Sequence, residues 1–371
     1  MKSKRILALM LALVMALSLA ACGGSKQEET PADNAGNGGD SDGTLDFGGA
    51  ELVVATWGWA EAGLKTLAAD FESQYNCTIV VDPTSGNGDR LNKLMAEQND
   101  PTADVALLTK SFAQTGNESG LFEKIDTSIV TSLGDLYDIA VNADGYGPCY
   151  SLCRYGIMYN ADALEQAGLP APTSYEDLFD DQYAHMVALP DMTSTAGPYM
   201  LVAMAEALGS SQEDVTPAME LMQEKKDNID LWYSTSSDVV NAFTTGEVNI
   251  AVFMDINMPS LTDSGLNMVW VDASEGSFAA PATVNVVKNC KNPELAQRFV
   301  EYLISKDTQD KIAEVMNEAP VNKNASMDDS LKTYLAFGED SMSALKEFDE
   351  AYIAANKEAW IDTFQRTVAV Q

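Results

Sequence analysis

Short apolar strands alternate with amphipathic helices from Glu51 onward, and this alternation constrains the fold more than any other feature of the sequence. In the helix that follows the first strand, Leu64, Leu67 and Phe71 recur at spacings of three and four residues, which places them on one face. Repeated β-α-β order predicts a mostly parallel sheet that helices cover on both faces. The expected strands are 52–55, 78–81, 105–108, 187–189, 249–254, 268–271 and 283–287, and the expected helices lie at 64–75, 91–95, 198–208, 239–243, 293–304 and 345–367.

The first 21 residues predict an export signal. Lys2, Lys4 and Arg5 give a positive start, and the apolar stretch 6–21 is shorter than the about 20 residues that a membrane span needs. Leu19-Ala20-Ala21-Cys22 looks like a bacterial lipobox, in which cleavage before the cysteine leaves its thiol to carry diacylglycerol. We therefore expect a signal peptide over 1–21 and lipidation of Cys22. A plain signal peptide with an incidental cysteine is the alternative.

The stretch that follows the signal is rich in Gly, Asp, Asn, Ser, Glu and Pro. Such a composition cannot bury enough apolar surface to fold, so residues 22–48 are predicted to be a flexible, lipid-anchored linker. The mature protein is then extracytoplasmic and bacterial, held at the cell membrane through Cys22. Folded structure is expected from Glu51.

The charge balance narrows the possible partners. Lys and Arg number 22 against 56 Asp and Glu, which gives a net charge of −34 at pH 7. Nucleic-acid binding needs clustered Lys and Arg, so we expect no nucleic-acid partner. The single histidine, His185, excludes His-rich metal sites and disfavours a His-based catalytic triad. No metal or other cofactor is expected.

The chain carries no catalytic motif that we recognise. Nucleophile-elbow, Walker, HExxH and paired-Cys zinc patterns are missing from the sequence, so we expect a protein that is not an enzyme. Cys149 and Cys153 are four residues apart, about 13 Å on a straight strand, and a disulfide would need a turn between them. Buried free thiols are the default, and the sequence does not decide whether Cys77 pairs with Cys290.

Four stretches, taken in their order along the chain, resemble the extracellular solute-binding proteins of ABC importers. The similarity is to the subgroup of iron(III), polyamine and thiamine receptors, and it covers the chain from about Glu51 to the C-terminus. The stretches are Thr56-Trp57-Gly58-Trp59; Tyr155-Gly156-Ile157-Met158-Tyr159-Asn160 followed by 172–178; Ala188 to Pro198; and Asn292-Pro293-Glu294-Leu295-Ala296 with Ala319-Pro320-Val321-Asn322.

The resemblance implies a hinged, two-lobed fold of the periplasmic binding protein type (class II), with two α/β lobes and a ligand held between them. Lobe 1 would comprise 49–153 plus 279–315, and lobe 2 would comprise 156–277 plus 320–371. Tyr155-Gly156 and Phe278-Ala279 are the expected hinge points. The protein would be a monomeric substrate-binding receptor that delivers a small solute to an ABC permease in the membrane.

The ends of the strands indicate where the solute would bind. In open α/β sheets, ligands lie beyond the carboxyl ends of the strands. That rule selects 56–61, 84–88 and 109–112 in lobe 1 and 192–197 and 254–257 in lobe 2. Two of these turns are small, polar and followed by a helix, as anion sites often are, so we expect a carboxylate- or phosphate-bearing solute. Ordinary helix caps are the structural alternative.

Aromatic and charged residues complete the predicted site. One of the two tryptophans that flank Gly58 is expected to stack on the solute. Lys110 and Arg154 lie near predicted loop and hinge positions, where a cation would pair with an anion, but both are expected to be solvated. The predicted ligand-binding residues are Thr56, Trp57, Trp59, Ser85, Gly86, Asn87, Thr193, Ser194, Thr195, Tyr233 and Asp255.

Other functions stay open at this point. A polyamine receptor would place an acid beside aromatics where this chain has Phe278-Ala279-Ala280-Pro281, and an iron(III) receptor would offer adjacent tyrosines, which are missing from the second half. Both are alternatives on the same fold. Alternatives from other classes are a lipid-anchored hydrolase and a surface adhesion or sensing lipoprotein.

Overall fold

The computed structural model describes residues 45–84, 86–194 and 196–369, and these described residues group into one compact unit. The predicted signal peptide, Cys22 and most of the predicted linker lie outside the described residues. The strands are β1 Ala50–Trp57, β2 Cys77–Thr84, β3 Val105–Thr109, β4 Cys149–Asn160, β5 Val187–Pro190, β6 Ile229–Tyr233, β7 Ile250–Met254, β8 Met268–Val271 and β9 Phe278–Val286.

Helices follow most of these strands, as the alternation predicted. They are α1 Glu61–Tyr75, α2 Asn87–Ala96, α3 Lys110–Glu118, α4 Ala161–Ala167, α5 Gly197–Ala207, α6 Thr216–Glu224, α7 Ser236–Thr245, α8 Met258–Thr262, α9 Pro293–Ile304, α10 Lys306–Met316, α11 Glu339–Ser343 and α12 Glu350–Thr367. Short 3-10 turns include η1 Gly58–Ala60, η3 Asp138–Ala140 and η7 Asp255–Asn257.

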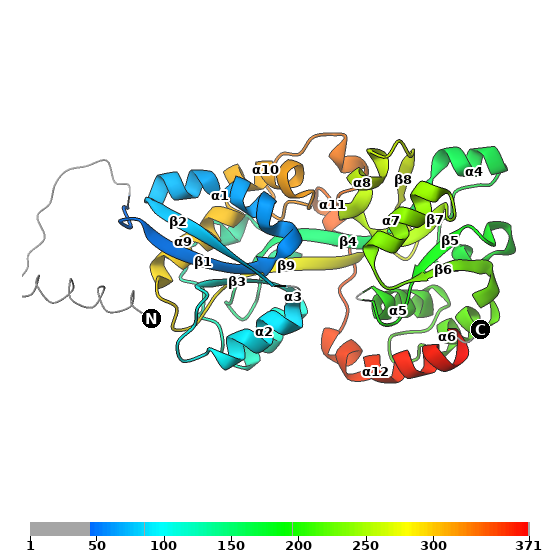
Figure 1. Cartoon of the computed structure of the whole chain (residues 1–371), viewed down its shortest axis with the longest axis horizontal. Coiled ribbons are helices and arrows are strands. Elements are labelled where there is room, and N and C mark those ends of the chain that lie inside the picture. The colour runs from blue at the N-terminus through cyan, green and yellow to red at the C-terminus, as the bar shows by residue number, and fades with distance from the viewer. Residues whose placement is uncertain (1–44, 85, 195, 370–371) are drawn as a thin grey trace, which may run out of the picture. The chain divides into compact units, whose positions relative to one another are not determined.

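The strands join into one mixed sheet in the order β2-β1-β3-β9-β4-β7-β5-β6, and β8 also pairs with β4 (Figure 1). Pairing is parallel at the two ends of the sheet, among β1, β2 and β3 and among β5, β6 and β7. The pairs made by β4 and β9 are antiparallel. The expected mostly parallel character therefore holds only within each end. We call the β2-β1-β3 end the first lobe and the β7-β5-β6 end the second lobe.

Strands β4 and β9 connect the two lobes. They pair with each other from Cys149–Thr283 to Tyr155–Phe278, and the two predicted hinge points face each other in that last pair. Beyond Tyr155, β4 pairs with β7 of the second lobe, whereas β9 pairs with β3 of the first lobe beyond Ala282. The predicted hinge therefore lies on two neighbouring strands.

Each lobe buries apolar side chains on both faces of its part of the sheet. In the second lobe Val187 and Leu189 belong to the apolar cluster beneath α5, α6 and α12, whereas Ala188 faces the other cluster. This alternation follows from the two-residue period of a strand. In Figure 1, α5, α6 and α12 lie on one side of β5 and β6, and α7 and α8 on the other.

Two predicted boundaries differ in the structure. The terminal helix begins at Glu350 instead of residue 345, because Asp349 caps it by accepting the Tyr352 N–H at 3.0 Å. Residues from 320 were assigned to the second lobe. However, the Tyr137 N–H donates to the Val321 carbonyl at 3.0 Å, which places residues near 321 against the first lobe.

Candidate functional site

The turns that follow β1, β2 and β3 converge at one end of the first lobe. Trp57 and Thr84, the last residues of β1 and β2, are partners in the sheet register. The Thr109 N–H, at the end of β3, donates to Asn87 Oδ1 at the start of α2, over 3.1 Å. The predicted loops at 56–61, 84–88 and 109–112 therefore lie together. Gly86 is the N-cap of α2, and Ser85 lies outside the described residues.

Trp57 and Trp59 stack on each other in this group of turns. Their ring centroids are 5.8 Å apart with an interplanar angle of 25°. The Arg90 guanidinium lies 4.7 Å from the centroid of the Trp57 ring, so Trp57 is engaged by its own protein. Trp59 is 55% exposed. Of the two rings, Trp59 is the one available to a solute.

Arg90 is a residue of the site that sequence reasoning missed. It extends from α2 and is fully buried, with Nη1 donating to the Leu107 carbonyl at 2.6 Å. Its Nε and Nη2 have no hydrogen-bond partner in the described structure. Burial lowers the pKa of Arg90 to about 10. This value is still well above 7, so the side chain is charged at neutral pH. The only sequence signal was an arginine beside the apolar Leu91 and Leu94.

In the second lobe, the polar turn after β5 is folded around Asp191. The backbone N–H and the hydroxyl of Thr193 both donate to Asp191 Oδ1 at 2.6 Å. The Ser194 hydroxyl donates to the Asp191 carbonyl at 2.7 Å and accepts the Gly197 N–H at 3.0 Å. These groups satisfy one another within the turn, whereas Ala196, the N-cap of α5, makes no side-chain cap hydrogen bond. Thr193 is exposed, Ser194 is buried, and Thr195 lies outside the described residues.

Three other predicted residues face the interior. Thr56 is fully buried at the end of β1. Tyr233 is 4% exposed, and its hydroxyl donates to the Val252 carbonyl at 2.6 Å. Asp255 is also fully buried. Of the predicted residues that the structure describes, Trp59 and Thr193 are exposed, whereas Trp57, Gly86 and Asn87 are half-buried.

Arg154 and Asp255 form a buried cluster at the hinge. The Arg154 N–H donates to Asp255 Oδ1 at 3.1 Å, and its guanidinium lies 3.5 Å from Asp255 Oδ2. The guanidinium also donates to the Tyr334 carbonyl at 2.6 Å and to Asp272 at 3.2 Å, and it stacks 4.5 Å from the Trp270 ring centroid. Arg154 is therefore buried, and the expectation of a solvated side chain was wrong.

Two carboxyl groups in this cluster are strongly perturbed. Burial raises the pKa of Asp255 to about 7, although the neighbouring Arg154 lowers it, and burial raises the pKa of Glu318 to about 7. The Cys153 thiol donates to Glu318 Oε1 at 3.4 Å. Both carboxyl groups are therefore easily protonated near neutral pH.

The four cysteines in the described residues are free and buried: Cys77, Cys149, Cys153 and Cys290. Cys149 and Cys153 lie on the single strand β4, so the turn that a disulfide would need is missing. Burial raises the pKa of each thiol, to about 12 for Cys149. Neutral thiols react slowly with oxidants.

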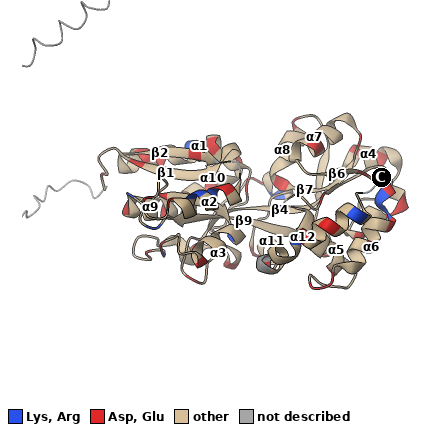
Figure 2. Cartoon of the chain, turned by 60° about the horizontal axis from the view of Figure 1, so that its bottom comes forward, with Lys and Arg blue, Asp and Glu red and all other residues tan. Residues whose placement is uncertain are grey.

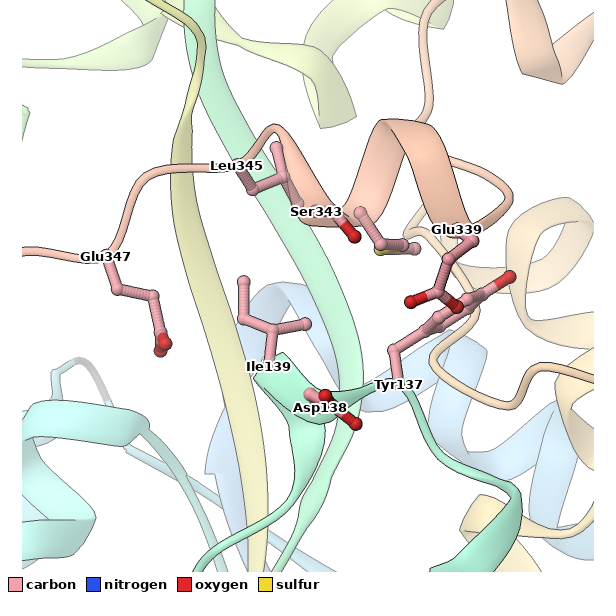
Figure 3. A pocket seen from close by; sticks show the side chains of 8 residues that line it. Tyr137, Asp138, Ile139, Glu339, Ser343, Leu345 and Glu347 are labelled. Carbon is pink, nitrogen blue, oxygen red and sulfur yellow. The ribbon is translucent and has the colours of Figure 1, made fainter.

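A pocket of about 260 Å³ lies between η3 and the residues around α11 (Figure 3). Its lining combines apolar Ile139, Met342 and Leu345 with three carboxylates. Figure 3 shows two of these, Glu339 and Glu347, on opposite sides of the pocket. Glu347 forms an ion pair with Lys110, the first residue of α3. This contact connects the pocket to the turns of the first lobe.

Acidic residues are spread over both lobes in the view of Figure 2. Among the described residues no cluster of three or more His, Cys, Asp or Glu has the geometry of a metal site. Within the same residues no helix has both the length and the apolar character to cross a membrane.

Two α/β lobes that share a sheet and are joined by paired strands define a hinged, two-lobed binding protein. Residues 66–339 match the family of bacterial extracellular solute-binding proteins, and the chain belongs to that family.

Several relatives match this chain over most of their length. An ABC transporter structure from Clostridium perfringens is 31% identical, with a TM-score of 0.74 over 85% of this chain and 99% of the other. The thiamine-binding periplasmic protein of Escherichia coli is 24% identical over 86% of this chain and 91% of its own. The putrescine-binding periplasmic protein of the same organism is 23% identical over 74% and 80%.

Proposed function

We propose that this protein is the substrate-binding receptor of an ABC transporter and that it captures a small polar solute bearing a carboxylate or phosphate group. The observation that carries the proposal is the convergence of three strand-end turns around Trp59, with the charged Arg90 beneath them and Lys110 beside them. A buried, incompletely paired guanidinium attracts an anionic group from outside.

The solute would bind between the lobes and hold them closed. In an empty receptor the open and closed arrangements differ by a few kcal/mol, and contacts made with both lobes at once favour the closed one. The hinge would lie at Tyr155 and Phe278. The first lobe would comprise about 49–153 plus 279–315 with the residues near 321, and the second lobe would comprise about 156–277 plus α12. The closed monomer would then dock on the membrane permease without changing the solute chemically.

The membrane attachment belongs to the same proposal. Residues 1–21 would be removed as a signal peptide, Cys22 would carry the lipid, and the linker up to residue 48 would let the receptor reach the permease. The mass of the mature protein tests this directly: a lipidated N-terminal cysteine adds the mass of diacylglycerol and an acyl chain, and Cys22→Ala should release the protein from the membrane fraction.

A thermal-shift panel tests the receptor function. It spans solutes of relatives with this fold: thiamine, putrescine and spermidine as cations, 2-aminoethylphosphonate and γ-aminobutyrate as zwitterions, and fructose 6-phosphate as an anion. A ligand at 100 times its Kd stabilises a protein by about 2.7 kcal/mol, which raises the melting temperature by several degrees. We expect at least one compound with an anionic group to do so.

Each alternative function has its own outcome in this panel. A shift by putrescine or spermidine alone would indicate a polyamine receptor. A shift by a ferric chelate, which is added to the panel for this purpose, would indicate an iron(III) receptor. Turnover of an ester or phosphate substrate would indicate a hydrolase, and no shift by any solute would favour an adhesion or sensing role.

Trp59 provides the matched mutational test. Trp59→Ala removes the exposed ring of the Trp57–Trp59 stack. A stacking contact between an aromatic ring and a solute contributes about 0.5–1.5 kcal/mol to the binding free energy. We expect Kd for the bound solute to rise about threefold to tenfold while the apo melting temperature changes little. Val80→Ala, which shortens another exposed apolar side chain of the first lobe, should leave Kd unchanged.

A further inference from the structure

Residues 345–348, between α11 and α12, form a strap that lies against the hinge. The Lys346 N–H donates to the Ser277 carbonyl at 2.9 Å, and the Ala279 N–H donates to the Lys346 carbonyl at 3.1 Å. The Phe348 ring packs on Phe278, with centroids 5.0 Å apart. Both backbone and side chain therefore fix the strap beside Phe278, where β9 pairs with Tyr155 of β4.

Neighbouring side chains of the strap reach different lobes. Lys346 pairs with Glu206 on α5 of the second lobe. Glu347 pairs with Lys110 at the start of α3 in the first lobe. Phe348 also contacts Tyr199 of α5, with ring centroids 5.6 Å apart. The strap is thus tied to both sides of the proposed solute site.

Lys110 belongs to the converging turns of the first lobe. It follows Thr109, whose N–H donates to Asn87. Phe112, in the same first turn of α3, lies against Gly88, where a Cβ would be 3.8 Å from the ring. The N-terminus of α3 adds its own positive potential at this position. Lys110 is therefore a cation that an anionic solute group would meet.

The Lys110–Glu347 pair is exposed enough to exchange. The two side chains are 38% and 46% exposed, whereas those of the Arg154–Asp255 pair are 6% and 0% exposed. Half-exposed ion pairs are weak because water and salt compete with them. Glu347 also lines the open pocket of Figure 3, which gives its side chain room to turn away from Lys110.

We infer that Glu347 is an intramolecular stand-in for the anionic group of the solute: it neutralises Lys110 in the empty receptor and is displaced when a solute binds. The inference rests on the proposed receptor function. It has a consequence for specificity, because an incoming group must outcompete a carboxylate. A phosphate or phosphonate, with more charge and three acceptor oxygens, does so better than another carboxylate. Glu347 then selects phosphate- or phosphonate-bearing solutes.

Chemical modification of Lys110 tests the pair without a known solute. The full-length mature protein is acetylated with a water-soluble succinimidyl ester, and the rate at each lysine is read by peptide mass spectrometry. Glu347→Gln should speed modification of Lys110 about threefold, the factor expected for losing a half-exposed ion pair. Glu339→Gln is the matched control, since it removes a carboxylate from the same pocket and leaves the pair intact. Equal Lys110 rates in the wild type and Glu347→Gln would overturn the inference.

Inorganic phosphate tests the displacement. At equal ionic strength, phosphate should protect Lys110 from acetylation better than chloride does, and protection should be about threefold stronger in Glu347→Gln. Lys306, which pairs with Asp310 on α10, is the internal control and should respond to both salts alike. Equal effects of phosphate and chloride on Lys110 would contradict the stand-in role.

The outcome separates the inference from the receptor function. If phosphate protects Lys110 but no compound of the thermal-shift panel binds, the receptor proposal fails and the exchangeable pair stands. If a panel compound binds the wild type and Glu347→Gln with equal affinity, the receptor stands and the stand-in role fails.

Discussion

Arg90 is the largest side chain that the described protein buries completely, and only one of its nitrogens has a clear acceptor. A buried charge without full pairing costs stability, and natural proteins keep such a group where it serves binding or specificity. Here the charge lies beneath the Trp57 ring at the converging turns of the first lobe.

Replacing Arg90 separates its effect on stability from its effect on solute binding. Arg90→Met keeps the length of the apolar stem and removes the charge, so we expect the free energy of unfolding to stay equal or to rise by about 1 kcal/mol. Affinity for an anionic solute should fall about tenfold, because the attraction of the buried cation is lost. Urea unfolding and calorimetric titration measure the two effects. A large loss of stability with unchanged affinity would show that Arg90 is structural.

Glu318 gives the protein a pH-dependent stability. Its pKa is 4.5 when exposed and about 7 in the folded protein, so between these values the folded state binds the proton that the unfolded state has released. Stability therefore falls as the pH rises from about 4.5 to about 7, by about 3 kcal/mol, and is constant on either side. Asp255 contributes with the same sign.

Glu318→Gln should remove this contribution. The variant cannot ionise, so its unfolding free energy should fall less between pH 5 and pH 8 than that of the wild type, and it should be the more stable of the two at pH 8. Urea unfolding at the two pH values measures the difference, and Glu339→Gln on the exposed α11 should behave like the wild type. Parallel pH profiles for Glu318→Gln and the wild type would contradict the argument.

Among the elements, the turn before α5 depends on a glycine. A Cβ built on Gly197 would lie 2.2 Å from the Asp191 carbonyl oxygen, so the helix start and the polar turn touch through backbone atoms. The sequence placed Gly197 in this turn but gave no sign that the contact was so close.

Gly197→Ala should disrupt that turn. Backbone atoms cannot move aside as a flexible side chain can, so we expect a loss of about 1–3 kcal/mol in the free energy of unfolding and weaker solute binding. Gly134→Ala, at a position with nothing within 4 Å of the added Cβ, is the control and should be nearly neutral. Thermal unfolding of both variants measures the difference.

The elements were predictable where their pattern is local. The periodicity of α9 gave its observed bounds, Pro293–Ile304, and the predicted helix at 239–243 lies within α7, which ends at Gly246 in a left-handed conformation. Strand β4 was not predicted as an element, because Cys, Arg, Tyr and Gly interrupt its apolar pattern. Residues 345–349 read as helix, but backbone pairing with β9 holds the strap extended.

The site was predictable only in part, because only some of its contacts leave a local pattern in the sequence. Turns at strand ends have a local signature, and the three turns of the first lobe do converge. Contacts between distant residues have none: Lys110 and Glu347 are 237 positions apart, and Arg154 meets Tyr334 across 180. Neither the strap nor the burial of Arg154 could therefore be read from the sequence.

For the molecule as a whole, Gly156 controls the approach of β4 to Trp270. A Cβ on Gly156 would lie 2.4 Å from Cζ2 of Trp270, the ring on which Arg154 stacks. Gly156→Ala should push this ring aside and disturb the hinge cluster, so the fall in radius of gyration that a bound solute causes should be reduced. Small-angle X-ray scattering with and without solute measures it. If the fall in radius of gyration were the same in Gly156→Ala as in the wild type, the lobes would bend at a place other than this hinge cluster.

The hydrogen bonds between β4 and β9 restrict how the lobes can move. Two separate tethers would allow each lobe to twist, slide and tilt on its own. Because the hydrogen-bonded pairing of β4 with β9 continues to Tyr155 and Phe278, the two strands bend together. The lobes then rotate about one axis that crosses both strands. Distances between spectroscopic labels on opposite lobes should then all change in proportion to a single angle of closure, whichever labelling sites are chosen.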